Sequence, residues 1–316
     1  MLIFASIFAA VIPMSAYLVL IWLVDRYDRE PFSLVLKNYL WGALGAIFLA
    51  LIGSIFLSTI IAFFVDAKIL KNISTFFVAP FVEEITKGLF LLITIRSRKF
   101  DNLTDGIVYG GAIGLGFGMT ENFLYFISYS TSLSDWVTIV VIRTLFSAVM
   151  HCVSTATFGA ALGYAKFKTG SSKITIPLLG LFTAMLIHFT WNFSISFEST
   201  AVLGFIFMII TIGIFITVFS ISVLGERKII FNELLEEAGS GLIPYNHLNI
   251  LNSSKRNRFG WVDESIRKLY IRAATTLAFR KMEFKKSKGD SRIFYLKDIE
   301  YYRNFIKNLL SNIRNQ

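Results

Sequence analysis

Cysteine is nearly absent from this chain, since Cys152 is the only one among 316 residues. A single cysteine forms no intramolecular disulfide and cannot supply a cysteine-rich metal site. Charged residues are also scarce, at 16% of the chain, whereas 55% of the residues are hydrophobic and the mean hydropathy is +0.63. No soluble globular domain needs such an excess of apolar residues, so the composition points to a membrane protein.

The hydrophobic residues gather in runs of about 20, the length of a helix that crosses a bilayer. The first run, Leu2–Val24, has no basic segment before it and is too long for a signal-peptide core, so we expect a membrane helix that the mature protein keeps. Six more spans are expected at about Leu34–Phe64, Phe76–Ile95, Gly106–Ser128, Arg143–Ala165, Ile174–Ser196 and Val202–Leu224. The second is long and punctuated by glycine, which predicts a tilted or broken helix, and Asp135–Ile142 is expected at the membrane interface before the fifth. The sequence therefore predicts an all-α polytopic membrane protein with about seven transmembrane helices.

Lysine and arginine are unevenly distributed among the connecting loops. One set of loops and the C-terminal tail hold nearly all of them, and the other set holds only Lys68 and Lys71. Because cytoplasmic loops are enriched in basic residues, we expect the N-terminus outside and the tail in the cytoplasm.

The composition becomes polar and basic after Leu224, which predicts a transmembrane domain at residues 1–224 and a cytoplasmic tail at residues 225–316. The tail has 18 Lys and Arg against 10 Asp and Glu, and its apolar residues recur at helical spacing in 226–238 and 262–279. We expect a helical, solvated extension that its charge holds near anionic lipid, with a regulatory docking role as the alternative. The net charge of +10 lies where membrane topology requires it, so nucleic acid is not expected as a partner.

Five ionisable residues lie inside apolar segments, where a charge is costly and marks a candidate functional site. They are Glu83, Glu84, Glu121, His151 and His188. Counted at 1.5 Å per residue from the expected helix ends, all five lie about 10–12 Å below the outer surface. Random scatter would not place one layer across four helices, so we expect these residues to form one site.

Helical spacing adds two neighbours to this layer. Lys87 follows Glu83 by four residues and Glu84 by three, so it can pair with either carboxylate and tune the pair. Asn192 shares a helix face with His188, and we expect it to orient that imidazole or the carbonyl of a substrate. The result is a polar cavity open toward the outside.

Two chemistries fit this set of side chains. Carboxylates and imidazoles together suit a divalent metal such as zinc with a bound water. Two carboxylates alone would also activate a water by general acid–base catalysis, without a metal. We expect Glu84 or Glu83 to activate the water. The residues expected to bind a metal, or to stabilise the oxyanion, are Glu121, His151 and His188.

Other functions use similar residues. A transporter would relay protons or bind a cation with the same carboxylate–imidazole layer, although transporters usually contain internal repeats and none is convincing here. A non-catalytic scaffold, such as an immunity protein, is a third interpretation. The motifs of several other proteases are missing: H-E-x-x-H, the G-x-S-G of rhomboid proteases and the G-x-G-D of presenilin-type proteases.

Two further features have structural interpretations. Gly110, Gly114 and Gly118 recur every four residues and follow no strand, which favours a close-packing helix face over a nucleotide-binding loop. Cys152 directly follows His151, and adjacent helix residues point in different directions, so we do not expect a cysteine nucleophile.

Five motifs follow one another along the chain. They are Asp25–Pro31, Glu83–Lys87, Phe117–Asn122, Arg143 with His151, and His188–Asn192. In this order they resemble the motifs of the PrsW family of bacterial intramembrane proteases, relatives of the CAAX-processing and bacteriocin-immunity membrane proteases. Asp28 and Arg29 depart from the Glu-Pro spacing usual in the family. The resemblance covers about residues 10–225.

The resemblance implies a protease of the bacterial inner membrane that makes a site-1-type cut in a single-pass membrane protein near the outer face. The founding role of the family is the cutting of an anti-sigma factor in a stress response. The residues that match its motifs are Glu83, Glu84, Glu121, His151, His188 and Asn192 as the catalytic set, with Lys87, Asn122 and Arg143 in support. A zinc-type and a glutamate-type mechanism both stay open.

Overall fold

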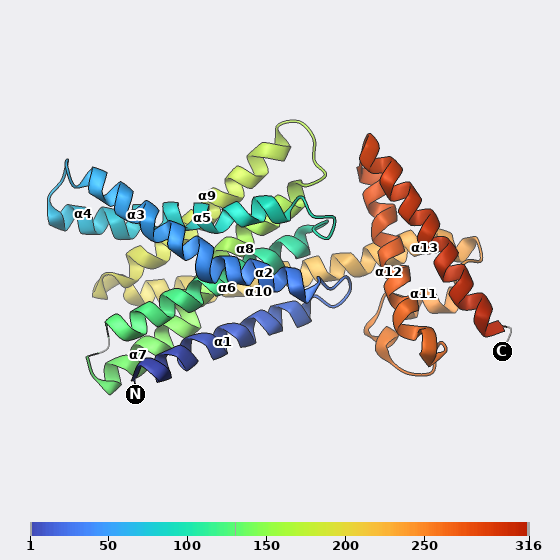
Figure 1. Cartoon of the computed structure of the whole chain (residues 1–316), viewed down its shortest axis with the longest axis horizontal. Coiled ribbons are helices and arrows are strands. Elements are labelled where there is room, and N and C mark those ends of the chain that lie inside the picture. Colours follow the sequence, from blue (N-terminus) through green and yellow to red (C-terminus); the bar gives the residue numbers. More distant parts are fainter. Residues whose placement is uncertain (1, 130, 315–316) are drawn as a thin grey trace. The chain divides into compact units, whose positions relative to one another are not determined.

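The computed structural model describes residues 2–129 and 131–314, and for 312–314 only the course of the backbone. Every regular element in these residues is a helix (Figure 1). The chain forms two compact units, of which the second combines Arg26–Arg29 with the residues from Ser220 onward. The expected domain boundary, after residue 224, lies five residues beyond the start of this second part.

The first unit is a bundle of helices formed by the described residues up to Asp25 and by Glu30–Phe219. Their bounds are α1 Leu2–Val24, α2 Phe32–Leu40, α3 Ile47–Ile61, α4 Ala67–Ile73, α5 Ala79–Thr94, α6 Leu103–Ser128, α7 Leu133–Ile142, α8 Ala148–Ala165, α9 Ser172–Ile195 and the first part of α10, Glu198–Gly239.

Short π-helical segments join three pairs of these helices end to end. Trp41–Ala46 joins α2 to α3, Ser74–Val78 joins α4 to α5, and Arg143–Ser147 joins α7 to α8. Single π turns are frequent at functional sites because they rotate the residues that follow them. The second expected span is thus one helix with a local widening at its glycines rather than two separate pieces.

Within the described residues, five helical stretches are long and apolar enough to cross a membrane, which agrees with a multi-pass membrane protein. They are Leu2–Val24, Phe32–Ile61, Leu133–Ala165, Ser172–Ile195 and Glu198–Gly239. α5 and α6 are not among them, since α5 carries three charged residues within five positions and α6 is rich in glycine. The total of seven spans stays a prediction.

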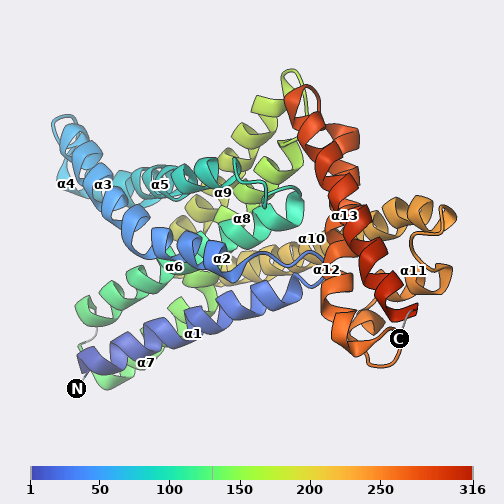
Figure 2. The same cartoon turned by 45° about the vertical axis from the view of Figure 1, so that its right-hand side comes forward.

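α6 is the central helix of the first unit and packs against α1, α2 and α8 (Figure 2). Every residue from Thr104 to Gly118 is buried. A Cβ atom added at Gly110 would lie 2.5 Å from the carbonyl oxygen of Thr155, and one at Gly114 would lie 2.1 Å from that of His151. These glycines let the backbones of α6 and α8 touch, so the predicted close-packing face is confirmed.

Two expected helix ends are wrong. The last membrane helix does not end at Leu224 but continues to Gly239, because one glycine costs a helix only about 1 kcal/mol and the apolar pattern continues through the buried Ile230 and Leu234. The segment Asp135–Ile142 is not separate from the next span. It belongs to a continuous helix of 33 residues, which has no glycine or proline before residue 148 to interrupt it.

The second unit contains the later part of α10 together with α11 Tyr245–Leu251, a 3₁₀ turn at Ser254–Asn257, α12 Glu264–Lys286 and α13 Asp290–Arg314. Its core includes Tyr270, Leu277 and Phe279, which are at most 1% exposed. Two cations, Lys281 and Arg303, each lie 2.7 Å from the same Glu237 oxygen. The solvated extension expected from the sequence is therefore a packed helical unit, and its attraction to anionic lipid stays a prediction.

His247 makes the stability of this unit sensitive to pH. Its ring is buried against Tyr270 and Trp261, and this burial lowers the pKa of His247 despite an opposing backbone hydrogen bond at Trp261. The unfolded chain then binds a proton below about pH 6.5 that the folded unit rejects, so stability falls as the pH drops through that range.

We expect hydrogen exchange in α11 and α12 of the full chain, corrected for the intrinsic rate, to accelerate between about pH 7.5 and pH 5.5. His247→Gln should remove the difference. An equal response of the variant and the wild type would show that other groups set the pH dependence.

Candidate active site

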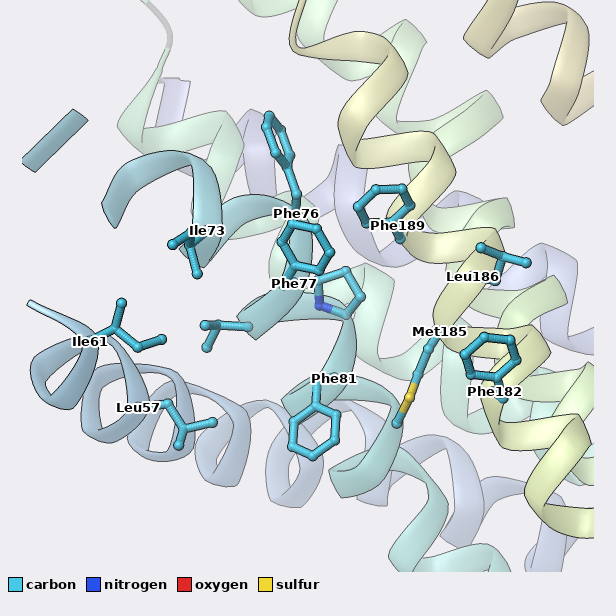
Figure 3. A pocket seen from close by; sticks show the side chains of 12 residues that line it. Leu57, Ile61, Ile73, Phe76, Phe77, Phe81, Phe182, Met185, Leu186 and Phe189 are labelled. Atoms are coloured by element: carbon cyan, nitrogen blue, oxygen red, sulfur yellow. The ribbon is translucent and has the colours of Figure 1, made fainter. Parts of the chain in front are cut away.

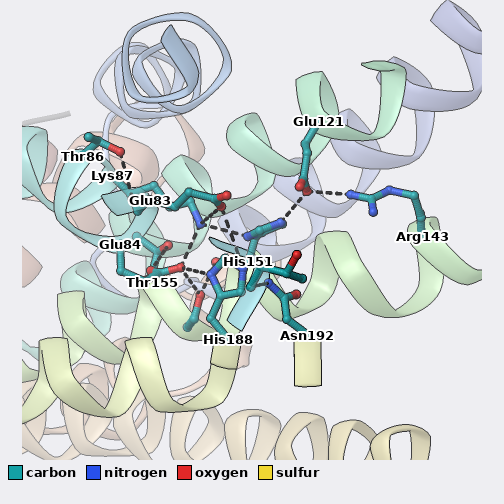
Figure 4. A network of polar contacts seen from close by, with 12 residues as sticks. Glu83, Glu84, Thr86, Lys87, Glu121, Arg143, His151, Thr155, His188 and Asn192 are labelled. Carbon is teal, nitrogen blue, oxygen red and sulfur yellow. Dashed lines mark hydrogen bonds and ion pairs between the residues drawn. The ribbon is translucent and has the colours of Figure 1, made fainter. Parts of the chain in front are cut away.

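The five carboxylate and imidazole side chains of the predicted site meet between four helices of the first unit (Figure 4). They are Glu83 and Glu84 on α5, Glu121 on α6, His151 on α8 and His188 on α9. Glu84, His151 and His188 are at most 2% exposed. His188 Nδ1 lies 3.0 Å from Glu84 Oε1, and His151 Nε2 lies 2.7 Å from Glu121 Oε2. The structure therefore brings together the residues that the sequence placed at one depth.

Both carboxylate oxygens of Glu84 accept hydrogen bonds. Its Oε1 atom accepts hydrogen bonds from Lys87 Nζ at 2.8 Å and Ser154 Oγ at 3.1 Å, besides the contact with His188, and its Oε2 atom accepts from Thr155 Oγ1 at 3.2 Å. A carboxylate accepts and does not donate, so His188 Nδ1 carries the proton in this contact. The other ring nitrogen, Nε2, then has a free lone pair.

Glu83 differs sharply from its neighbour. Its Oε2 atom is buried without a hydrogen-bond partner, although Lys87 Nζ lies 3.6 Å away and His188 Nε2 lies 3.8 Å away. A buried oxygen left without a partner is costly. His188 Nε2 and Glu83 Oε2 lie 3.8 Å apart, and neither makes a hydrogen bond within the described residues.

Lys87 links the two histidine contacts. Its ammonium lies 2.9 Å from His151 Nδ1 and 4.1 Å from the centre of the Phe117 ring. An ammonium group only donates, so His151 Nδ1 accepts and His151 Nε2 donates its proton to Glu121. His151 thus uses both ring nitrogens, whereas His188 uses one.

Arg143, at the start of a π segment, positions Glu121. Its Nη2 atom donates to Glu121 Oε2 at 2.6 Å, and its Nε atom donates to the buried Asn122 at 3.0 Å. The guanidinium also lies 3.6 Å from the centre of the Tyr125 ring. Glu121 is the most exposed of the five side chains, at 19%, so this end of the site is the most open.

The side-chain hydrogen bond of Asn192 goes to the backbone and not to His188. The Asn192 Nδ2 atom donates to the backbone carbonyl of Thr75 at 3.1 Å, within the π segment before α5. Asn192 therefore ties α9 to the beginning of α5 at one edge of the site. Cys152 is buried on α8 near Gly111 of α6, as expected for a packing residue.

Ser154 and Thr155 are the site residues that sequence analysis missed. Both hydroxyls bind Glu84, and both residues are fully buried. They follow His151 on α8 by three and four residues, which places them on the same face. That spacing is the signal that would have identified them.

Removing one hydroxyl tests their role. Thr155→Val keeps the shape of the side chain but leaves Glu84 Oε2 without its donor, so we expect a loss of about 10-fold in activity, as for other residues that orient a catalytic histidine. Thr157→Val is the matched control, because the Thr157 hydroxyl binds only a carbonyl of its own helix. Equal activity of both variants would mean that Thr155 does not position the site.

A metal fits this cluster. One donor atom from each of Glu83, His151 and His188 lies within 4.8 Å of the others, and two histidines with one glutamate form a common catalytic zinc set. Formal charges leave the site one negative charge in excess, with three carboxylates against Lys87 and Arg143. His151 would have to exchange one of its present partners for the metal. The ligand set predicted from the sequence had Glu121 in place of Glu83.

Comparisons with known proteins agree with this chemistry. A family model described as PrsW family intramembrane metalloprotease matches residues 30–221. The chain is 29% identical over 195 residues to Protease PrsW of Bacillus subtilis (strain 168), which covers 60% of this chain and 82% of that protein. It is 31% identical over 194 residues to Protease PrsW of Clostridioides difficile (strain 630), which covers 58% and 79% respectively. No solved structure gives a significant match.

The family match covers more than half of the chain and includes all the ionisable residues of the four-helix site. The match leaves out nearly all of the second unit, namely Arg26–Arg29 and the residues from 222 onward. A buried Glu/His/His cluster among apolar helices suits metal-assisted hydrolysis of a peptide bond within a membrane. The chain belongs to the PrsW family of intramembrane metalloproteases, which are hydrolases of peptide bonds.

Proposed function

We propose that this protein cleaves a single-pass membrane protein near the extracytoplasmic face of a bacterial inner membrane, with its basic C-terminal unit in the cytoplasm. The observation that carries the proposal is the approach of Glu83, His151 and His188 within one buried cluster. Glu121 and His188 each lie seven residues, or about 10 Å, before the ends of α6 and α9, which supports a cluster in the outer half of the membrane. The family resemblance supports a site-1-type cut of an anti-sigma factor, and it favours hydrolysis over transport by the same side chains.

We assign the metal-binding role to Glu83, His151 and His188. When bound, the metal supplies a Lewis acid for the scissile carbonyl and lowers the pKa of a bound water. Glu84 fixes the tautomer of His188 and holds its ring in place, a common role for a carboxylate beside a metal-binding histidine.

Glu121 has a different role in this proposal. It lies at the open end of the site, where its Oε2 atom meets Arg143 and His151. A carboxylate there can take the proton of an attacking water and return it to the leaving amine. Arg143 keeps that carboxylate oriented.

New N-termini in the membrane proteome test the proposal. Cells that express the wild-type protein or Glu83→Gln at matched levels are compared under several envelope stresses. We expect cuts near the outer face of a single-pass protein only with the wild type. Indistinguishable profiles would contradict proteolysis and make ion flux in liposomes the next measurement.

Metal content tests the assignment of ligands. We expect about one zinc or other divalent ion per purified wild-type chain, and loss of the ion in His188→Ala. His247→Ala is the matched control, because His247 is the one histidine outside the site, and it should keep the ion. A metal-free but active wild type would favour the glutamate mechanism.

A further inference from the structure

A pocket of about 550 Å³ lies on the first unit, between the end of α5, the end of α8 and the beginning of α9. Three of the residues that line it are cations, Arg96, Lys166 and Lys173, and the others are apolar. None of the lining residues is acidic. The pocket therefore combines apolar walls with a positive charge that its own lining does not neutralise.

The three cations lie where the helices end. Arg96 follows the last residue of α5 by two positions, Lys166 directly follows α8, and Lys173 is the second residue of α9. α8 and α9 belong to stretches that are long and apolar enough to cross a membrane. The charges thus lie at the level of the lipid head groups, whereas Phe158 and Leu181, about two turns inside α8 and α9, lie at the level of the acyl chains.

The cations differ in their partners. Lys166 Nζ donates to the backbone carbonyls of Ser97, at 3.0 Å, and of Phe100, which fixes it in the wall of the pocket. The side chains of Arg96 and Lys173 make no ion pair with a carboxylate within the described residues. An arginine and a lysine beside one pocket, both without an acidic partner, suit a phosphate group.

These charges distinguish the pocket from the apolar groove between α3 and α9 in Figure 3. Leu186 on α9 lines that groove, and none of the groove's lining residues is charged. An acyl chain would find apolar walls in either place. A phosphate group attached to the chain would find cations only in the pocket at Arg96, Lys166 and Lys173.

The three helices of the pocket touch one another beside it. A Cβ atom at Gly88 of α5 would lie 2.7 Å from the ring of Phe158 on α8, and one at Gly180 of α9 would lie 2.2 Å from the Cβ of Ala161 on α8. Beyond these contacts the helix ends leave the pocket between them. A ligand that fills the pocket therefore contacts all three helices.

We infer that this pocket binds an anionic phospholipid, with the phosphate at the three cations and an acyl chain along the apolar walls. Basic pockets between membrane helices are known to bind the head groups of anionic lipids. The lipid joins the ends of α5, α8 and α9, the helices that carry Glu83, Glu84, His151 and His188. The inference concerns binding alone, so its test does not depend on proteolysis.

Native mass spectrometry of the full chain, released from a neutral detergent, tests the inference. The probes are phosphatidylglycerol, phosphatidylcholine with the same acyl chains, and glycerol phosphate, which has a phosphate but no acyl chain. We expect the chain to retain phosphatidylglycerol and to lose the other two. Equal retention of the two lipids would overturn the inference. Retention of glycerol phosphate would overturn it in favour of a site for a soluble phosphate.

Charge variants locate the binding site. Arg96→Gln combined with Lys173→Gln should weaken the binding of phosphatidylglycerol by about 30-fold, the effect expected of two cations near an anionic head group. Lys166 is kept because it binds backbone carbonyls. Lys68→Gln combined with Lys71→Gln removes the same charge from α4, outside the pocket, and should bind as the wild type does. Equal binding by the two double variants would overturn the inference.

A pair of tryptophan variants tests the place of the acyl chain. Leu178→Trp should narrow the pocket and weaken the binding of phosphatidylglycerol by about tenfold. Leu186→Trp puts the same bulk eight residues further along α9, in the groove of Figure 3, and should bind as the wild type does. Both leucines are well exposed, at 60% and 49%, so both variants should keep the unfolding midpoint of the lipid-free wild type. Equal binding by these two variants would overturn the inference.

Discussion

Glu83→Gln is expected to lower kcat/KM for the single-pass substrate by about 100-fold or more, because it replaces one of the three proposed metal ligands and even an outer partner of a metal ligand is worth about 10–100-fold, while the protein keeps its stability. Glu83 has a buried oxygen without a hydrogen-bond partner, so the substitution breaks little of the packing. Lys87 keeps its bond to Glu84 at 2.8 Å. The measurement pairs the cleavage rate in liposomes with the thermal unfolding midpoint in detergent.

The adjacent Glu84 provides the matched control. Glu84→Gln changes the same atoms one residue later, but it puts an amide nitrogen among the donors of Lys87, Ser154 and Thr155. Breaking a buried ion pair of this kind destabilises a protein by about 3–5 kcal/mol, so we expect a lower midpoint and about 10–100-fold less activity through the misplaced His188. Glu83→Gln thus tests a direct role in the reaction, and Glu84→Gln tests the positioning of His188. Wild-type activity in Glu83→Gln would remove Glu83 from the site, and equal midpoints would contradict the role given to Glu84.

The ionisable layer could be predicted because charges inside apolar runs are few and helix rise is constant. Counting 1.5 Å per residue placed Glu121 and His188 at one depth, and each lies seven residues before the end of its helix. The count for His151 started at Arg143, which is inside a helix that begins at Leu133, so its place in the cluster depends on packing. The division of labour between Glu83 and Glu84 could not be predicted, since neighbours on a helix point about 100° apart and the rotation of α5 depends on packing. Either residue would have fitted the sequence.

The π segments explain the other differences. Nothing in the apolar pattern marks where a helix takes up an extra residue, so the hydrogen bond from Asn192 to the Thr75 carbonyl could not be predicted. The long α10 has a similar explanation. Its apolar pattern for the membrane passes into an apolar pattern for the core of the second unit, at Ile230 and Leu234, and no proline separates the two.

Gly114→Ala is expected to disable the enzyme without touching an ionisable group. The added Cβ would lie 2.1 Å from the carbonyl oxygen of His151 and 2.7 Å from the Cα of Cys152, so α6 and α8 must move apart. Overpacking of this kind costs about 1–3 kcal/mol. The shift also carries His151 away from Glu121 and Lys87, and a misplacement of about 1 Å can reduce catalysis 10²-fold.

Alanine substitutions at Gly118 and Gly213 provide controls in which the added Cβ meets fewer atoms. A Cβ at Gly118 would lie 3.0 Å from the Cα of Ala148, and one at Gly213 on α10 would meet nothing within 4 Å. We therefore expect activity and unfolding midpoint to fall in the order Gly213→Ala, Gly118→Ala, Gly114→Ala, with the first equal to or above the wild type because alanine favours a helix. A Gly114→Ala variant as active as Gly213→Ala would mean that the two backbones do not touch beside His151. A variant that unfolds earlier but cleaves normally would mean that their contact supports the fold alone. If the contact between α6 and α8 holds the site together, Gly114→Ala lowers the activity and the unfolding midpoint together.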